Sequence, residues 1–428
     1  MKRALFGLGL LAACACSASD DAPANVEDAA PPKLCTLSMT CAQPIIDDSK
    51  RSCQFSVVDG KGTKIYDSFA GVELRGRSSL AFPKKNYSIE LRSADASSAP
   101  ENPTNLLGMG KDADWVLDGA WADRSFSRNA LIFDTFRDLR TQDWAPQSRL
   151  CTMSLNAAPQ GIYRVVEKIK RDDDRVPVAA DNGMGQSFVI KQDDDGVLNM
   201  PLGLQSKWKL VYPNQDTATA TQRAGVQAFL DSFRSALAGT SADSNSGIFA
   251  LLDFENAVDF VLVQELSKNI DAYNLSVHLA RSAGGKAILV PWDIDLSLGQ
   301  PIVRNEAASA NNDKPEGFIV HRTDFINNLA KVSAFKSRLA SRWRELRGGA
   351  FSEPALLGLL DRYETTLDPA KVAENFGIWP IDRIDYTQIY PPYSLPAVAS
   401  HAEEVSRLRA FISARLVWID AHIDTYPN

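Results

Sequence analysis

One stretch of this sequence, residues 265–299, constrains the fold more than any other. It begins at the end of an apolar run with helical spacing, residues 258–266, which predicts a helix. Two short apolar runs follow at residues 275–280 and 287–290, and Gly284-Gly285 between them is typical of a hairpin turn. The stretch therefore predicts a helix that leads directly into a β-hairpin.

Three acidic residues stand at the ends of these predicted elements. Asp271 follows the helix, whereas Asp293 and Asp295 follow the second strand, beside Trp292. Because a single hairpin separates these positions, all three carboxylates can face one pocket. Such a pocket suits a general base and a ligand for a divalent metal, which phosphoryl transfer requires. Ordinary alternatives stay open, because most Asp residues lie in solvated turns and half-buried carboxylates often accept hydrogen bonds from neighbouring donors.

The composition is that of an ordinary globular protein. The chain has 428 residues, of which 45% are hydrophobic and 9% aromatic, so it can build an ample core. By length it can hold two or three domains or one bilobal enzyme. The net charge of −7 argues against nucleic acid as a partner, because nucleic-acid binding normally needs a basic face.

The N-terminus predicts export from the cytoplasm. Lys2 and Arg3 precede an apolar run at residues 4–13, which has the length of a signal-peptide core and is too short to span a bilayer as a mature helix. Leu11-Ala12-Ala13-Cys14 resembles a bacterial lipobox, in which the cysteine becomes the lipidated first residue. A plain signal peptide cleaved nearby is the alternative.

These features divide the N-terminal region into two segments. We predict a lipoprotein signal peptide at residues 1–14 and a flexible tether, rich in Ala, Asp and Pro, at residues 15–33. The mature protein would then be anchored through Cys14 to a bacterial membrane, on its extracytoplasmic side. Ala15 after the cysteine favours the outer membrane or the cell surface.

Four cysteines beyond the tether fit an oxidising compartment. Cys35, Cys41, Cys53 and Cys151 permit two disulfides. Zinc binding is the competing interpretation, but no CxxC pair and no nearby histidine support it. We therefore predict disulfides, with the pairing left open.

The rest of the chain changes from β-rich to helical near residue 212. Residues 34–212 hold several runs of strand length, of which residues 53–58 and 64–69 flank a hairpin turn at Asp59-Gly60. Residues 213–428 carry the acidic hairpin, and the helices expected there are residues 220–237, 254–268, 323–346 and 403–422. We therefore predict an α+β chain with the layout of an atypical protein-kinase-like bilobal fold, in which a β-rich N-terminal lobe precedes a mainly helical C-terminal lobe.

Basic and hydroxyl residues in the β-rich part are candidates to bind phosphate. Arg75, Arg77 and Ser78 lie in a polar loop between two strands, where arginine forks, hydroxyls and backbone N–H groups can contact phosphates. The loop has neither a GxGxxG nor a Walker pattern, and a solvated hairpin is the alternative. Lysines near strand ends are further candidates, although charges at such positions usually lie on the surface: Lys84, Lys85, Lys168, Lys170 and Lys191.

Several blocks of the sequence, taken in order, resemble the CotH kinase family. Besides the acidic hairpin, the blocks are Arg75-Gly76-Arg77-Ser78-Ser79, Phe82-Pro83-Lys84-Lys85, Asp114-Trp115-Val116-Leu117, Asp123 with Arg128-Asn129, Gly161-Ile162-Tyr163, Glu167-Lys168-Ile169, and Phe188-Val189-Ile190-Lys191. Together they extend over residues 72–299. Each block is weak alone, but their order is a specific signal.

The resemblance implies an atypical protein kinase that binds ATP with Mg²⁺ or Mn²⁺ and phosphorylates Ser or Thr hydroxyls of secreted or surface proteins. By resemblance, Asp271 would be the catalytic base and Asp293 the metal ligand. Asp295 and Ser276 would complete the metal site, with Ser276 at the place where typical kinases have Asn. The nucleotide would be held by residues from a larger set: Arg75, Arg77, Ser78, Lys84, Lys85, Glu167, Lys168 and Lys191.

Two other functions stay open at this point. A catalytically inactive CotH-like protein would act as a surface adhesin or an assembly scaffold, which fits a lipoprotein in a compartment that contains little ATP. Transfer of AMP to hydroxyls, in place of phosphate, would use the same pocket and the same metal site.

Overall fold

The computed structural model describes residues 33–193, 196–199, 207–239, 243–273, 275–300, 313–319, 324–383, 395 and 397–427. The predicted signal peptide, the lipidation residue Cys14 and all of the tether except Lys33 lie outside these residues. Residues Pro32–Asn428 form one unit by their contacts. Within the described part, no helix combines the length and the apolar character needed to cross a membrane.

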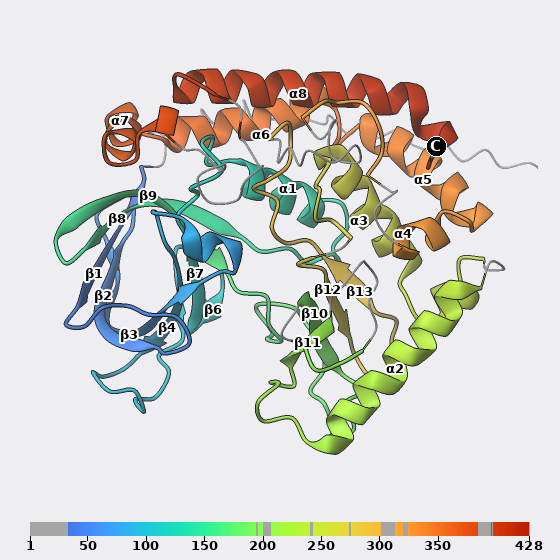
Figure 1. Cartoon of the computed structure of the whole chain (residues 1–428), viewed down its shortest axis with the longest axis horizontal. Helices are drawn as coiled ribbons and strands as arrows, with labels where there is room; N and C mark the ends of the chain where they lie inside the picture. Colours follow the sequence, from blue (N-terminus) through green and yellow to red (C-terminus); the bar gives the residue numbers. More distant parts are fainter. Residues whose placement is uncertain are drawn as a thin grey trace, which may run out of the picture. The chain divides into compact units, whose positions relative to one another are not determined.

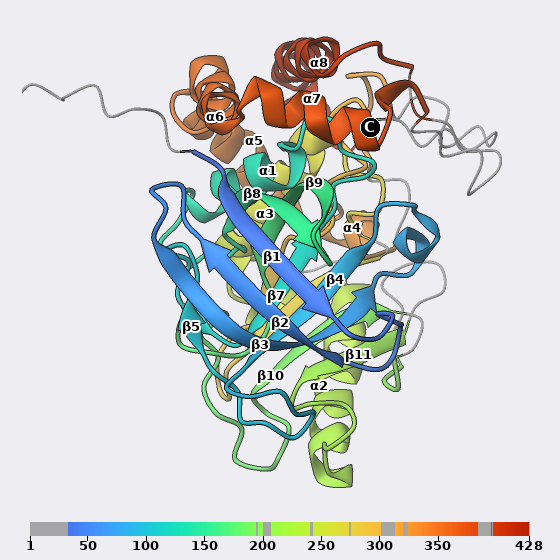
Figure 2. The same ribbon diagram turned by 90° about the vertical axis from the view of Figure 1, so that its left-hand side faces the viewer.

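The N-terminal part of the structure is a closed barrel of seven strands in the order β1-β2-β3-β4-β7-β9-β8 (Figure 2). Its neighbouring strands are antiparallel except β1 and β8, which pair in parallel and close the barrel. Closure removes the free edges that an open sheet would expose. The strands are β1 (Cys35–Cys41), β2 (Arg51–Val58), β3 (Lys64–Arg75), β4 (Asn86–Arg92), β7 (Asp114–Asp118), β8 (Ser148–Leu155) and β9 (Ala158–Glu167).

The barrel follows from strict alternation in its first strands. In β1 every second side chain is buried, which turns Leu37 and Met39 inward and leaves the polar residues between them outside. The predicted hairpin turn between β2 and β3 is confirmed, because the Asp59 carboxylate accepts hydrogen bonds from the backbone N–H groups of Lys61 and Thr63.

A second sheet has four antiparallel strands in the order β11-β10-β12-β13. These strands are β10 (Phe188–Asp193), β11 (Lys207–Tyr212), β12 (His278–Arg281) and β13 (Ile288–Val290). Strands β10 and β11 thus pair with the hairpin that carries the acidic residues. The boundary predicted at residue 212 therefore falls inside a sheet, because strand pairing joins segments that are separate in sequence. A short pair, β5 (Thr104–Asn105) and β6 (Lys111–Asp112), completes the strands.

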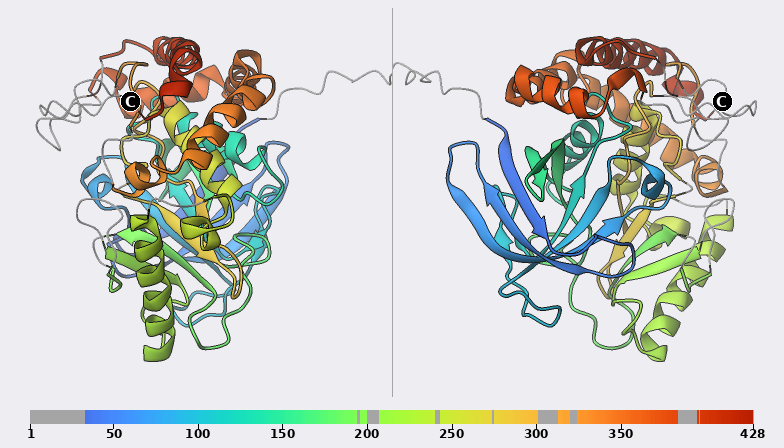
Figure 3. Two further views of the ribbon diagram at one scale, coloured as in Figure 1. Left: turned by 90° about the vertical axis from the view of Figure 1, so that its right-hand side faces the viewer. Right: turned by 60° about the vertical axis from the view of Figure 1, so that its left-hand side comes forward.

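Helices pack on this second sheet and beside it (Figures 1 and 3). One core cluster joins Ile190 of β10, Trp208 of β11 and Leu279 of β12 to Phe229 of α2 and Val261 of α3. The helices are α1 (Arg128–Arg137), α2 (Ala220–Ala238), α3 (Phe254–Ser267), α4 (Asp324–Leu329), α5 (Ser333–Arg347), α6 (Glu353–Thr366), α7 (Pro369–Ile378) and α8 (His401–His422). Helix α8 packs against α3 and α6, and α7 contacts barrel strand β9.

The α+β class is confirmed, whereas two details differ from the sequence predictions. The β-rich part closes into a barrel, which the pattern of strands did not predict. The single helix expected at residues 323–346 is wrong, because α4 and α5 are separate helices. Between them, the N–H groups of Lys331 and Val332 bond three residues back, to Asn328 and Leu329, so the four-residue ladder of the helix is interrupted.

Two disulfides tie the first strand to its neighbours, as the four cysteines predicted. Cys35 bonds Cys151 and joins β1 to β8, and Cys41 bonds Cys53 and joins β1 to β2. In both cases the two cysteines stand directly opposite each other in the strand register. All four side chains are buried, so these bonds belong to the barrel core.

The two disulfides differ in how much they constrain the unfolded chain. They close loops with sequence separations of 116 and 12 residues, so removing the longer link should release more unfolded-state entropy. We expect Cys35→Ser/Cys151→Ser to lower the free energy of unfolding by about 4–5 kcal/mol and Cys41→Ser/Cys53→Ser by about 3 kcal/mol. Urea unfolding of the two variants measures the difference, and the reverse order would contradict this explanation.

Candidate active site

The two acidic residues after β13 lie in a loop, residues 291–299, that we call the acidic loop. Its backbone is unusual, because Asp293 has φ of 64° and Leu298 has φ of 51°, in the left-handed region that residues with a Cβ rarely occupy. Ser276 also has a positive φ, and its hydroxyl donates to the Asp293 carboxylate at 3.1 Å. Such conformations cost roughly 1–3 kcal/mol each and persist where surrounding contacts enforce them.

Helix α3 delivers Asp271 next to this loop. The helix ends at Lys268, which is itself left-handed with φ of 50°. The following residue, Asn269, is 1% exposed, and its side chain accepts from the backbone N–H of Asp271 at 3.2 Å and donates to the backbone carbonyl of Asp293 at 3.3 Å. One amide therefore holds two of the predicted site residues, Asp271 and Asp293, in adjacent segments.

The first two residues of α1 also bind the acidic loop. Asn129 Oδ1 accepts from the backbone N–H of Ile294 at 2.8 Å. The Arg128 guanidinium donates to the backbone carbonyl of Ser297 at 3.0 Å. The acidic loop is thus fixed by backbone hydrogen bonds to the end of α3 and to the start of α1.

Arg128 is the centre of a buried charge network. Its guanidinium, which is 1% exposed, pairs with Asp123 at 2.7 Å and with Glu404 of α8 at 2.6 Å. Asp123 also accepts from the backbone N–H of Arg128 at 2.9 Å, so it supports the start of α1. Burial opposes ionisation of Asp123, but the charge of Arg128 and these hydrogen bonds lower the pKa of its carboxyl below the usual value.

Arg75 and His278 are among the residues from other elements that contact Trp292 of the acidic loop. The Arg75 guanidinium, at the end of β3, lies 5.1 Å from the centre of the Trp292 ring, and the His278 ring lies at 6.3 Å in an edge contact. Burial lowers the pKa of Arg75, while the charge of Asp293 opposes this shift. Burial, followed by the charge of Lys191, lowers the pKa of His278 to about 3, so this imidazole is neutral near pH 7.

Lys191 stands on the sheet that adjoins the acidic loop. It is directly opposite His278 of β12 and Lys209 of β11, so the three side chains share one face of the sheet. Lys191 also forms an ion pair with Asp193 on its own strand. The structure therefore places Arg75 beside the segment that carries Asp293, and Lys191 on the adjoining sheet, two strands away from β13.

Negative charge inside the acidic loop affects the ionisation of Asp295. Burial is the largest cause that raises the pKa of Asp295 well above its usual value, followed by the negative charges of Asp293 and Asp118. Asp118 lies at the end of β7 and accepts from the backbone N–H of Ala120 at 2.8 Å. The site therefore concentrates negative charge that a bound cation would relieve.

The donor atoms suit Mg²⁺ or Mn²⁺ bound together with a nucleotide. In the described ranges, no three His, Cys, Asp or Glu side chains are grouped so as to hold a metal by themselves. Mg²⁺, however, is usually bound through one or two carboxylates plus substrate phosphates and water. Asp293, Asp295 and Ser276 offer oxygen ligands of this kind, with Arg75 near Asp293 and Lys191 on the adjoining sheet as cations for phosphate. The residues present therefore fit the expected cofactors.

Four of the predicted nucleotide-binding residues make their contacts elsewhere. Glu167 pairs with Arg175 at 2.8 Å and accepts from the backbone N–H of Gln147; burial raises its pKa to about 7 despite the charge of Arg175. Lys168 contacts Asp114 at 3.3 Å, and the Lys85 ammonium donates to the Leu80 carbonyl. None of these contacts involves the acidic loop.

The fourth, Lys84, is buried between the barrel and α7. Its ammonium donates to the Ile162 carbonyl at 2.6 Å and to Asn375 of α7 at 2.8 Å, and it lies 4.9 Å from the Tyr163 ring centre. Burial lowers the pKa of Lys84 to about 7, and the charge of Asp118 opposes the shift. These contacts make Lys84 a link between the barrel and α7.

The loop after β3 is an exposed part of the predicted site. Arg77 and Ser78 are both exposed, and Ser78 begins a short 3-10 helix, Ser78–Ala81. Both residues make further interactions within the structure. They follow Arg75 directly, so they lie at the same end of β3 as the residue that contacts Trp292.

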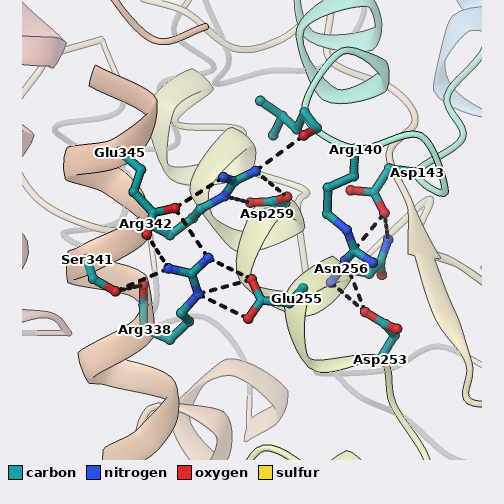
Figure 4. A network of polar contacts seen from close by, with 11 residues as sticks. Arg140, Asp143, Asp253, Glu255, Asn256, Asp259, Arg338, Ser341, Arg342 and Glu345 are labelled. Carbon is teal, nitrogen blue, oxygen red and sulfur yellow. Dashed lines mark hydrogen bonds and ion pairs between the residues drawn. The ribbon is translucent and has the colours of Figure 1, made fainter. Parts of the chain in front are cut away.

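Helix α3, which delivers Asp271, is fixed at its other end by a polar network (Figure 4). Arg338 and Arg342 of α5 reach Glu255 and Asp259 of α3, with the Arg342–Asp259 ion pair at 2.8 Å. In the same network, Asn256 donates to Asp143 at 3.0 Å, and burial raises the pKa of Asp143 to about 6. The network restrains the first two turns of α3, and therefore its direction toward the acidic loop.

A family model described as CotH kinase protein matches residues 72–419. This chain belongs to the CotH family. The match extends far beyond residue 299, where the recognisable motifs end, so the helices of the C-terminal part belong to the family domain. A comparison with curated proteins found no match. Membership suggests a kinase-type phosphotransferase.

Several residues that build the site of this CotH protein were not assigned a role from the sequence. Asn269 and Asn129 hold the acidic loop, and Asp118 adds a third negative charge. Asn269 stands two residues before Asp271, and Asn129 lies in one of the blocks that resemble the family. Their positions in the sequence therefore indicated that they lie near the site, but not what they bind. The two asparagines act through backbone groups of the acidic loop and Asp118 acts through its charge on Asp295, and no local pattern reveals these distant partners.

The buried pair of Arg128 and Glu404 predicts a large stability effect in the CotH protein. Glu404→Ala removes one of the two carboxylates that balance the buried Arg128 guanidinium, and breaking a buried ion pair typically costs about 3–5 kcal/mol of unfolding free energy. Arg409→Ala, on the same helix, removes only a solvent-exposed ion pair with Asp361 and should cost about 0–1 kcal/mol. Urea unfolding compares the two, and equal small losses would contradict a supporting role for α8.

Proposed function

We propose that this CotH protein transfers the γ-phosphate of ATP to Ser or Thr hydroxyls of secreted or surface proteins, with a divalent cation. The observation that carries the proposal is the side chain of Asn269, which holds the backbones of Asp271 and Asp293 together. Phosphoryl transfer needs a base for the incoming hydroxyl and a cation held at the phosphates, and these two residues supply the required groups.

Each residue of the site has a distinct role in this proposal. Asp271 accepts the proton of the attacking hydroxyl. Asp293 holds the cation, with Asp295 as a second carboxylate, and Ser276 orients the Asp293 carboxylate through their hydrogen bond. When bound, the cation screens the negative charge of the phosphates. Arg75 and Lys191 are the protein cations best placed for phosphate, because their neighbours are residues of the acidic loop and the adjoining sheet.

We propose further that the barrel and the remainder of the chain act as the two lobes of a kinase-like enzyme. Arg75 comes from the barrel, whereas Asp271, Asp293 and Lys191 come from the second sheet and its connections. A nucleotide bound at these residues would therefore touch both parts. This origin of the site residues supports the proposed bilobal arrangement.

Labelled ATP tests the reaction directly. With Mn²⁺ and a generic acceptor such as casein, the wild type should transfer label from γ-labelled ATP but not from α-labelled ATP. Asp271→Asn and Asp293→Asn should each lower the rate by at least about 100-fold, because general-base catalysis alone contributes about 10²–10⁴-fold. Asp173→Asn is the matched control, because it removes an exposed carboxylate at another place.

Each alternative gives a different result in this assay. Transfer of the α-label would favour nucleotidyl transfer, and folded protein that binds no nucleotide would favour an adhesin or scaffold. Unchanged γ-label transfer by Asp271→Asn and Asp293→Asn would show that these residues do not perform the reaction.

We also propose that the protein is lipid-anchored through Cys14 to a bacterial membrane, outside the cytoplasm. The lipobox sequence supports this, and Cys16, two residues further on, offers a matched control. Cells grown with labelled palmitate should incorporate the label into the wild type and into Cys16→Ala, but not into Cys14→Ala. Labelled Cys14→Ala would overturn the proposal.

A further inference from the structure

The peptide unit between Asp293 and Ile294 is bound at both of its polar atoms. Its carbonyl, which belongs to Asp293, accepts from Asn269 Nδ2 at 3.3 Å. Its N–H, which belongs to Ile294, donates to Asn129 Oδ1 at 2.8 Å. The two asparagines lie at the end of α3 and at the start of α1, so neither can move without disturbing a helix terminus.

This peptide controls where the Asp293 carboxylate points. Rotating the peptide unit changes ψ of Asp293, and Asp293 already occupies the left-handed region with φ of 64°. A residue with a Cβ leaves that region when its contacts are lost, because the extended and right-handed regions are lower in energy. The bond to Asn129 is the shorter of the two that hold the peptide.

We propose that Asn129 is a positioning residue that holds the Asp293 carboxylate in the orientation that binds the divalent cation. The inference rests on the proposed function, because it assigns Asn129 to the cation site of the same reaction. Side chains that orient metal ligands typically change metal affinity by about 10–100-fold when they are removed. Asn129 is half-buried, so it has no large share in the hydrophobic core.

An asparagine suits this position for two reasons. Its carbonyl oxygen accepts the Ile294 N–H, while its amide nitrogen faces the Asp118 carboxylate at 3.5 Å, so both contacts agree with one orientation of the amide. The amide also carries no charge. An additional carboxylate here would stand beside Asp118, whose charge already acts on Asp295.

The test measures Mn²⁺ affinity by electron paramagnetic resonance in the presence of a non-hydrolysable ATP analogue. Asn129→Ala should weaken Mn²⁺ binding about 10–100-fold. Affinity for the analogue without metal should stay within about twofold, because Asn129 is not expected to touch the nucleotide. Asn129→Asp keeps the acceptor oxygen for Ile294, so we expect it to restore part of the lost affinity.

Asn156→Ala is the matched control for the loss of an asparagine that binds backbone. Asn156 Oδ1 accepts from the backbone N–H of Cys41 at 2.8 Å, the same length as the Asn129 bond, but in the barrel. We expect the Mn²⁺ affinity of the Asn156→Ala variant to equal that of the wild type. The unfolding midpoint of every variant is measured in parallel, so that a folding defect is recognised.

The possible results separate this inference from the proposed function. Wild type and Asn129→Ala that bind Mn²⁺ equally would overturn the role of Asn129 alone. If Asn129→Ala weakened binding of Mn²⁺ and of the metal-free analogue by the same factor and also lowered the unfolding midpoint, the role of Asn129 would also be overturned. That result would show that Asn129 is a purely structural residue. Wild type that binds Mn²⁺ but transfers no phosphate would overturn the kinase proposal only. Wild type that binds no Mn²⁺ would overturn both.

Discussion

The rest of the site depends on the ion pairs and hydrogen bonds that the buried guanidinium of Arg128 makes. An arginine taken out of water is costly unless its donors are satisfied and its charge is balanced. Here Asp123 and Glu404 balance the charge, and the Ser297 carbonyl accepts a hydrogen bond from the guanidinium. These partners come from the segment before α1, from α8 and from the acidic loop. A single side chain therefore ties the C-terminal helix to the loop that carries the candidate metal ligands.

Hydrogen bonds to backbone groups consequently shape the site. Asn269 and Asn129 bind one peptide unit of the acidic loop, and Arg128 binds another carbonyl of that loop. Backbone groups are present whatever the local sequence, so their partners determine the conformation. The left-handed backbone of Asp293 follows from those partners, since an isolated aspartate would avoid it.

The sequence predicted the local elements of this site well and its supporting contacts poorly. The helix and hairpin around the acidic residues were correct because apolar periodicity reports which side of a segment is buried. The same periodicity could not show that β1 returns to β8, because closure depends on pairing between strands far apart in the chain. Lys84 and Glu167 show the same limit. Lys84 was a phosphate candidate from its position near a strand and Glu167 from the family resemblance alone, yet inside the fold Asn375 binds Lys84 and Arg175 binds Glu167.

The parallel pairing of β1 with β8 has a consequence for the order in which the protein can form. A chain is synthesised from its N-terminus, so β1 can pair with β2 early. The other edge of β1 stays unpaired until β8 is available. During that interval the first strand presents an unpaired edge, which is a place where nascent chains associate wrongly. Barrel closure therefore depends, for its earliest strand, on a partner 116 residues later in the sequence, and the Cys35–Cys151 disulfide links the two strands covalently.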